Sequence, residues 1–151
     1  MWQIIVLIIL LVLSGFFSMS ETALMALSKI RIRHMVDDGV KGAKLVEKLT
    51  EDPNKLLGAI LIGNNIVNIL ASSLATTLFV SLVGPSGVGI ATAVMTVLVL
   101  IFGEITPKSI AKQKSEQVSL KVSKPISIIV KLFKPFIGIF TFISSGFIRL
   151  L

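Results

Sequence analysis

Residues 56–103 read LLGAILIGNNIVNILASSLATTLFVSLVGPSGVGIATAVMTVLVLIFG and contain no charged side chain. This stretch is long enough for two membrane-spanning helices of about 20 residues with a turn between them. The turn signal is the Gly-Pro-Ser-Gly run at residues 84–87. We therefore expect spans over about 54–83 and 88–106, the first capped by Asp52 and opened by Pro53.

A third apolar segment opens the chain. Residues 2–27 begin WQIIVLIILLVLSGFF and continue into the more polar SMSETALMAL. The segment has no basic flank before it and is too long for a signal peptide, so we expect a retained span. A soluble four-helix bundle would need charged outer faces, which residues 56–103 lack. The predicted fold is an all-α membrane protein, a single domain over residues 1–151 with three transmembrane helices.

The basic residues indicate the orientation of these spans. Of 15 Lys and Arg residues, seven lie between Lys29 and Lys55 and eight between Lys108 and Arg149, with none in the turn at 84–87. By the positive-inside rule, the N-terminus and that turn lie outside and both basic segments lie in the cytoplasm. This clustering favours the lipid bilayer over nucleic acid as the partner of a chain with net charge +7. We expect a multi-pass protein of the plasma (inner) membrane.

The two basic segments predict amphipathic juxtamembrane helices. Residues 28–51 show helical apolar spacing broken at Asp37-Asp38-Gly39. Residues 108–151 are polar at first and then apolar, interrupted by Lys131, Lys134 and Pro135. A fourth span would bury or snorkel both lysines, so we expect an interfacial belt instead.

Polar side chains occur inside two of the predicted spans. Ser14 and Ser18 share one face of the first span; Asn64 and Asn68 share one face of the second, with Asn65 beside them. Polar groups at membrane depth are costly, and their default interpretation is functional. Two structural alternatives stay open, because serine can bond the carbonyl four residues back and asparagine can join helices without binding an ion.

The third span ends on Gly103-Glu104 shortly before Pro107. Proline lacks an N–H and clashes with the carbonyl four residues back, so we expect the helix to end there with free carbonyl oxygens. Such oxygens, with the Glu104 carboxylate, predict a cation site. Alternatively, Glu104 forms an ion pair with Lys108, four residues later. A similar alternative exists for Glu21, near the inner end of the first span, whose candidate ion-pair partners are Lys29 and Arg31.

All the candidate ligands are oxygens, which suit Mg²⁺, Ca²⁺, Na⁺ or a proton and disfavour zinc or copper. The chain has no cysteine, so it forms no disulfide and no cysteine metal site. It also shows no nucleophile–base arrangement, and we expect no enzyme activity.

Three segments together resemble the transmembrane domain of the CorC/CNNM (cyclin M) magnesium transporter family: residues 16–44, FFSMSETALMALSKIRIRHMVDDGVKGAK; residues 56–76, LLGAILIGNNIVNILASSLAT; and residues 101–116, IFGEITPKSIAKQKSE. The resemblance covers nearly the whole chain. It implies a symmetric dimer of three-span subunits with a juxtamembrane belt. It also implies Mg²⁺ efflux driven by the Na⁺ gradient through an inward-facing site between the helices.

In the family, motif side chains and backbone carbonyls hold Mg²⁺ between the spans. Carried over by motif, the implied metal ligands are Ser18, Asn64, Asn65, Asn68, Gly103 and Glu104, with Asn68 as the expected direct ligand. Family members usually continue into cytosolic CBS modules that bind ATP; the chain reaches Leu151 without them, so we expect a membrane domain from a longer protein. The rival functions are a Mg²⁺-sensing or anchoring module without transport, and a Na⁺ or proton carrier.

Overall fold

A computed structural model describes the backbone of residues 2–148 and the side chains within this range except those of 141 and 144–148. The all-α prediction is confirmed, since the described residues form helices and no strand. In chain order the elements are α1 (Trp2–Ala26), α2 (Lys29–Asp37), α3 (Ala43–Thr50), α4 (Pro53–Val83), the 3₁₀ turn η1 (Gly84–Ser86), α5 (Gly87–Leu98), the π-helix η2 (Val99–Ile105), α6 (Thr106–Gln113) and α7 (Ser115–Ile148).

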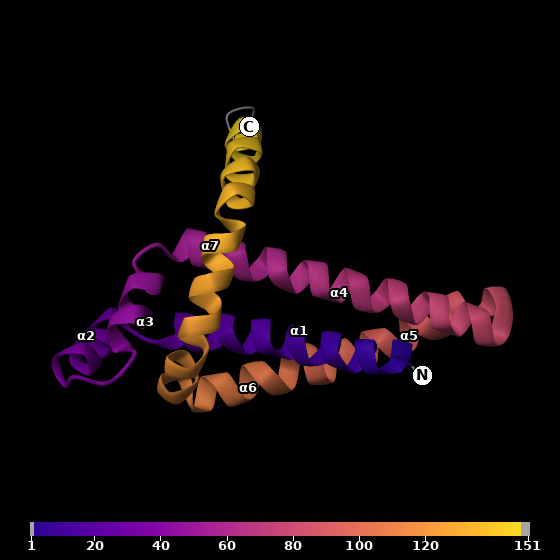
Figure 1. Cartoon of the computed structure of the whole chain (residues 1–151), viewed down its shortest axis with the longest axis horizontal. Helices are drawn as coiled ribbons and strands as arrows, with labels where there is room; N and C mark the ends of the chain where they lie inside the picture. The colour runs from indigo at the N-terminus through magenta and orange to yellow at the C-terminus, as the bar shows by residue number, and fades with distance from the viewer. Residues whose placement is uncertain (1, 149–151) are drawn as a thin grey trace.

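The long helices lie side by side along the longest axis of the molecule. α1, α4 and the continuous α5–η2–α6 rod form the bundle, with α2 and α3 at one end and the α4–α5 turn at the other (Figure 1). Within the described residues, two segments are long and apolar enough to cross a membrane, Trp2–Ala26 and Pro53–Gln113. The second folds back on itself at η1, where Gly84 adopts a φ of 73° that favours glycine.

The apolar sides of these helices are only partly buried inside the chain. In the most apolar 18-residue stretch of Trp2–Ala26, only 33% is buried inside the chain. In the corresponding stretch of Pro53–Gln113, only 17% is buried. A core helix of a soluble protein is mostly buried. Large apolar side chains such as Ile8, Ile69 and Val97 stand more than half exposed. The bundle therefore offers a lipid-compatible surface, as expected of a membrane domain.

Packing differs between the two halves of the bundle. Towards the η1 turn, Ala71 and Ala75 of α4 pack against Met95 of α5, and their small size lets the two helices approach. Towards the other end lies the main apolar cluster, whose most deeply buried large side chains include Leu24, Leu56 and Ile126. This cluster joins α1, α2, α3, α4, α6 and α7, so it anchors the basic helices onto the bundle.

The prediction that the helix ends before Pro107 is wrong. The helix widens into the π-helical turn η2 and continues as α6, with Pro107 in the first turn of α6. The Thr106 N–H bonds to the Ile101 carbonyl, five residues back. A wider turn of this kind repositions the carbonyls near a proline, so the rod passes the residue that would otherwise break it.

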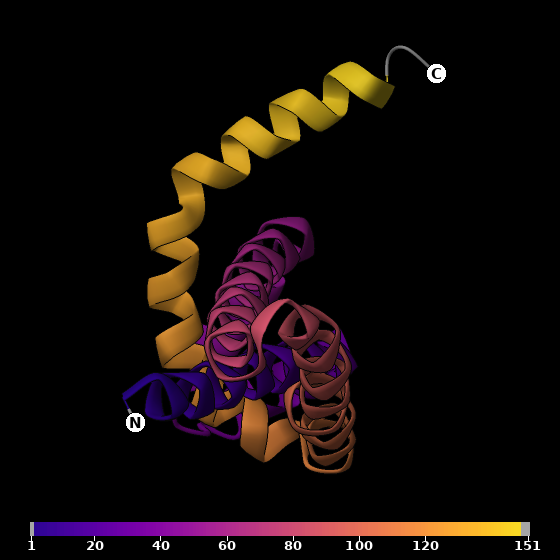
Figure 2. The same cartoon turned by 90° about the vertical axis from the view of Figure 1, so that its right-hand side faces the viewer.

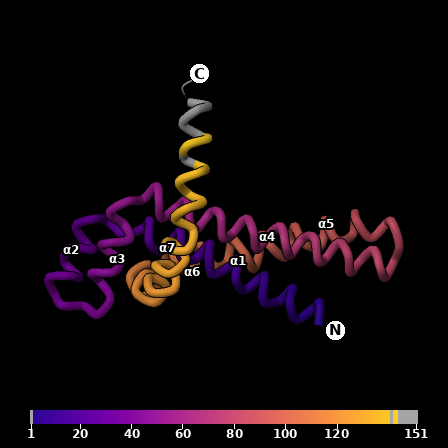
Figure 3. The backbone as a smooth tube through the Cα atoms, turned by 45° about the horizontal axis from the view of Figure 1, so that its top comes forward, coloured from indigo at the N-terminus to yellow at the C-terminus, as the bar shows by residue number. Residues whose placement is uncertain are grey.

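The juxtamembrane helices form as two short pieces and one long helix. α2 ends at Asp37, at the predicted break, and its N-cap Ser28 accepts from the Arg31 N–H at 3.2 Å. The predicted 108–151 segment is divided: residues 108–113 extend the bundle as α6, whereas α7 turns away and crosses the bundle direction (Figures 1 and 3). Figure 2 shows α7 curving outwards, and two prolines, Pro125 and Pro135, lie inside it. Residues 149–151 lie outside the described residues.

Candidate cation site

A polar contact joins α1 to α4 inside the apolar bundle. The Ser14 hydroxyl donates to the Asn64 side-chain oxygen at 3.3 Å, and the Asn68 amide donates to the same oxygen at 3.5 Å. Ser14 is 1% exposed, so this contact is shielded from the surroundings. Interhelical bonds of this kind stabilise membrane bundles by roughly 0.6–2 kcal/mol each.

Glycines let the backbones approach at this level. A Cβ on Gly63 would lie 2.5 Å from the Phe17 ring, and one on Gly103 would lie 2.7 Å from the Ser14 hydroxyl oxygen. Neither site has room for a methyl group. The glycine of the predicted site, Gly103, is therefore placed directly against Ser14 by the packing of η2 on α1.

A backbone carbonyl also faces α1 at this position. A Cβ on Gly15 would lie 2.9 Å from the Phe102 carbonyl oxygen and 3.2 Å from the Pro107 ring. In the π-helical register this carbonyl would receive the N–H of residue 107, which is a proline and has none. The helix does not end at Pro107, yet the proline still leaves the Phe102 carbonyl, which faces α1, without its in-register donor.

Two buried polar atoms have no hydrogen-bond partner among the described residues. They are the Ser18 hydroxyl oxygen and the Asn68 side-chain oxygen. The neighbouring Ser20 shows the usual alternative, because its hydroxyl donates to the Phe16 carbonyl at 2.7 Å. Leaving a buried polar group unpaired costs about 1–3 kcal/mol, so each orphan calls for an explanation, of which a bound ion or water is the ordinary one.

The two orphan atoms belong to opposite flanks of the Ser14–Asn64 contact. α1 and α4 run in opposite directions (Figure 1). Ser18 follows Ser14 by one turn and Asn68 follows Asn64 by one turn, so the two residues are separated along the bundle by roughly 11 Å, two helical turns. The oxygens thus form a line through the bundle rather than a compact six-ligand shell.

The remaining predicted ligands are placed differently. Glu104 is partly buried at the start of the last turn before α6, and no hydrogen bond or ion pair engages it among the described residues. The Lys108 ammonium lies 3.9 Å from the Glu21 carboxylate, so Lys108 pairs with Glu21 rather than with Glu104. Asn65 is exposed on another side of α4 and does not join Asn64 and Asn68.

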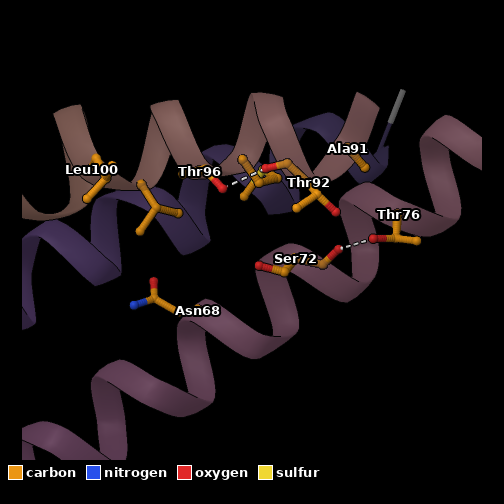
Figure 4. A pocket seen from close by; sticks show the side chains of 9 residues that line it. Asn68, Ser72, Thr76, Ala91, Thr92, Thr96 and Leu100 are labelled. Carbon is orange, nitrogen blue, oxygen red and sulfur yellow. Dashed lines mark hydrogen bonds between the residues drawn. The ribbon is translucent and has the colours of Figure 1, made fainter. Parts of the chain in front are cut away.

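A cleft extends from Asn68 towards the η1 turn; most of its surface is apolar, with a few hydroxyl and amide groups. It has a volume of about 320 Å³ and is lined by Asn68, Ser72, Thr76, Ala91, Thr92, Met95, Thr96, Val99 and Leu100. Figure 4 shows Asn68 on α4, and Thr92 and Thr96 on α5, directed into the space between the helices. The Thr92 and Thr96 hydroxyls donate to carbonyls four residues back at 2.8 and 2.7 Å, so their oxygens remain as acceptors.

The threonines of this cleft are absent from the predicted site. The available signal was their i, i+4 spacing, Ser72 with Thr76 and Thr92 with Thr96, which places each pair on one helix face. The described residues hold no group of three or more His, Cys, Asp or Glu side chains that would cage a metal. The polar groups of the line and cleft are therefore neutral oxygens, and Glu104 is the predicted carboxylate near them.

Comparison with known proteins gives a consistent result. A family model described as the cyclin M transmembrane N-terminal domain matches residues 5–151. The chain is 44% identical over 146 residues to a UPF0053 protein of Haemophilus influenzae, covering 97% of this chain and 35% of that protein. It is 43% identical over 139 residues to the UPF0053 inner membrane protein YfjD of Escherichia coli, covering 92% and 32%.

A more distant relative has a named activity. The polyamine export protein of Salmonella typhimurium is 28% identical over 161 residues, covering 98% of this chain and 36% of that protein. The chain thus spans about a third of the length of the curated relatives that it matches.

Proposed function

The chain belongs to the cyclin M transmembrane domain family, and from this premise we propose that it carries Mg²⁺ across the plasma (inner) membrane. In this proposal α1, α4 and the α5–η2–α6 rod each cross the bilayer, with the N-terminus outside. Transport is outward and is driven by the Na⁺ gradient. Two copies assemble as a homodimer, and cytosolic CBS modules follow α7 in the longer protein.

The observation that carries the proposal is the pair of unpartnered oxygens on Ser18 and Asn68, held either side of the Ser14–Asn64 bond. Such atoms are costly inside an apolar bundle, and a bound ion or water offsets that cost. Mg²⁺ prefers oxygen ligands and keeps several of its waters. A hydrated ion can therefore contact oxygens that lie too far apart to coordinate it directly.

All but one of the predicted ligands then have a role. Ser18 and Asn68 supply neutral oxygens, and Asn64 orients Asn68 through its 3.5 Å hydrogen bond. Glu104 supplies the negative charge near the cytoplasmic end, with backbone oxygen from the Gly103 region. Asn65 is exposed on α4, so we assign it no ligand role within one chain.

The basic residues support the proposed orientation. α2, α3 and α7 carry most of the Lys and Arg residues and lie at one end of the bundle, whereas the η1 turn at the other end has none (Figure 1). This distribution follows the positive-inside rule. Gly89 and Ala93 remain exposed on α5, and their small size makes this the side on which we place the second copy.

Export of a polyamine is the second candidate. The relative from Salmonella typhimurium bears that name, and a line of oxygen acceptors continued by the cleft suits an extended polycation. Flux assays in liposomes distinguish the candidates. We expect Mg²⁺ flux above that of empty vesicles, stimulated by an opposing Na⁺ gradient. Spermidine flux without Mg²⁺ flux would replace the first candidate by the second, and no flux of either would favour a sensing or anchoring module.

The matched variants are Ser18→Ala and Ser20→Ala, two buried serines on one helix. We expect Ser18→Ala to lower Mg²⁺ flux about tenfold while leaving the bundle as stable as before, because an unpaired hydroxyl is removed. Ser20→Ala should keep the flux, since that hydroxyl is already bonded to its own helix. Equal flux in both variants would remove Ser18 from the site.

A further inference from the structure

A second concave site lies at the basic end of the bundle, away from the polar line. α3, the first turn of α4 and the middle of α7 enclose a groove of about 340 Å³. Its floor is apolar and its rim is charged. The residues that line it include Lys48, Leu49, Lys55, Leu56, Ser127 and Lys131.

Three lysines from three different helices meet at this groove. Lys48 comes from α3, Lys55 from α4 and Lys131 from α7. No carboxylate lies within ion-pair distance of any of them among the described residues. Two acidic residues share the rim, Glu51 and Asp52, and Asp52 is engaged as the N-cap of α4, accepting from the Lys55 N–H at 3.1 Å. The rim therefore keeps a net positive charge and free ammonium donors.

The neighbouring side of α7 is apolar and unpaired. Ile128 and Leu132 are 67% and 66% exposed, and Phe136 and Ile139 continue this side of the helix. Lys131, beside Leu132 in sequence, lies between this apolar side and the groove. A helix with adjoining apolar and basic sides is typical of the membrane interface, where phosphate groups meet acyl chains.

We infer that this groove binds the phosphate group of one anionic phospholipid. The lysines 48, 55 and 131 donate to the phosphate oxygens, Ser127 stands beside them, and the acyl chains follow the exposed apolar side of α7. The apolar side is what commits the site to a lipid, because a soluble phosphate ester would gain nothing from it. The bound lipid would add a link between α3, α4 and α7, which already pack together through the main apolar cluster.

The test is native mass spectrometry of the purified chain in detergent, titrated with phosphatidylglycerol or phosphatidylcholine. We expect one tightly retained phosphatidylglycerol and much weaker phosphatidylcholine binding. Lys55→Gln and Lys131→Gln should each weaken phosphatidylglycerol binding about fivefold. Lys41→Gln removes the same charge from the exposed α2–α3 connection, outside the groove, and should change binding less than twofold.

Three results of this titration would overturn the inference. Equal affinity for the two lipids would show that charge is not recognised. An equal loss in Lys41→Gln would show a diffuse surface attraction rather than a site. Displacement of the lipid by glycerol phosphate at comparable concentration would assign the groove to a soluble ester. As a second arm, Ile128→Ser combined with Leu132→Ser should weaken lipid binding without changing any charge, and full retention in that variant would also refute the lipid assignment.

Discussion

The Ser14 hydroxyl and the Asn64 side-chain oxygen, 50 residues apart in sequence, are joined at 3.3 Å between α1 and α4. Ser14→Ala removes this bond and leaves the Asn64 oxygen with only the longer contact to Asn68. We expect the free energy of unfolding in detergent to fall by about 1 kcal/mol. Ser81→Ala, at the exposed outer end of α4, is the control and should change it by less than about 0.5 kcal/mol. Equal effects would mean that the interhelical bond adds nothing.

Gly103 is predicted to tolerate no side chain. In Gly103→Ala the new methyl group meets the Ser14 oxygen, and we expect a loss of about 1–3 kcal/mol in unfolding free energy. Adding Ser14→Ala should recover part of this loss, because the atom that clashes is gone. Gly138→Ala, inside α7, is the control: nothing lies within 4 Å of its new Cβ, and the change should raise helix stability slightly. Absence of recovery in the double variant would contradict the assigned contact.

Glu104→Gln tests the charge of the proposed cation site. The carboxylate has no partner among the described residues, so the fold should survive the change. We expect Mg²⁺ affinity, measured by calorimetry in detergent, to fall at least about tenfold, since the ion loses its charged ligand. Glu51→Gln, an exposed change at the start of α4, should leave affinity as it is. Unchanged affinity in Glu104→Gln would remove this residue from the site.

Asn68 and Asn65 form a matched pair on α4. Asn68 carries an unpartnered buried oxygen, whereas Asn65 is exposed. We expect Asn68→Ala to weaken Mg²⁺ binding several-fold and Asn65→Ala to preserve it in the monomer. A reversed order would show that the ligands come from the exposed side of α4, as they would if a second copy completed the site.

The Arg31–Glu116 pair joins α2 to the start of α7 through two hydrogen bonds, at 2.6 and 3.0 Å. Hydrogen bonding from Arg31, aided by its charge, lowers the pKa of Glu116 below the ordinary 4.5. A lowered carboxyl pKa stabilises the fold above the ordinary pKa and ceases to do so as pH falls through the folded value. We therefore expect the protection of α2 and of the first turns of α7 against hydrogen exchange, measured relative to the intrinsic exchange rate at each pH, to fall as the pH is lowered below about 4.5.

Glu116→Gln provides the control for this pH dependence. The variant should exchange faster than wild type at neutral pH and lose that difference in acid, with the effect also reduced by salt, because both groups are exposed. If the difference in hydrogen exchange between wild type and Glu116→Gln were the same at every pH, the Arg31–Glu116 pair would not be what stabilises the contact between α2 and α7.

Several features could be predicted from neighbouring residues alone. Asp52 and Pro53 mark the start of α4, and the structure places the helix at Pro53–Val83 with the Asp52 side chain as its cap. The break after Asp37 was also predictable. Such signals act within one turn of helix, so they do not depend on what the helix packs against.

Other features were beyond this kind of prediction. Pro107 led to the prediction of a helix end, which is wrong, because the local effect of a proline is equally compatible with an end, a kink or a π-helical turn. η2 packs against α1 at Gly15 and Gly103, and this contact is made by a helix that continues through η2 into α6. The pairing of Glu21 with Lys108 likewise depends on α1 lying beside α6, 87 residues later in the chain.

The sequence by itself determined that this chain is helical, where its apolar segments begin and turn, and which polar residues lie inside them, because uncharged length, caps and prolines are local properties. Only the tertiary structure decided which of those polar residues meet. Spacing along one helix places Ser14 with Ser18 and Asn64 with Asn68, but the rotation of α1 against α4 comes from side-chain packing, notably the Phe17 ring against Gly63. That rotation is what turns two separate polar faces into one line of oxygens.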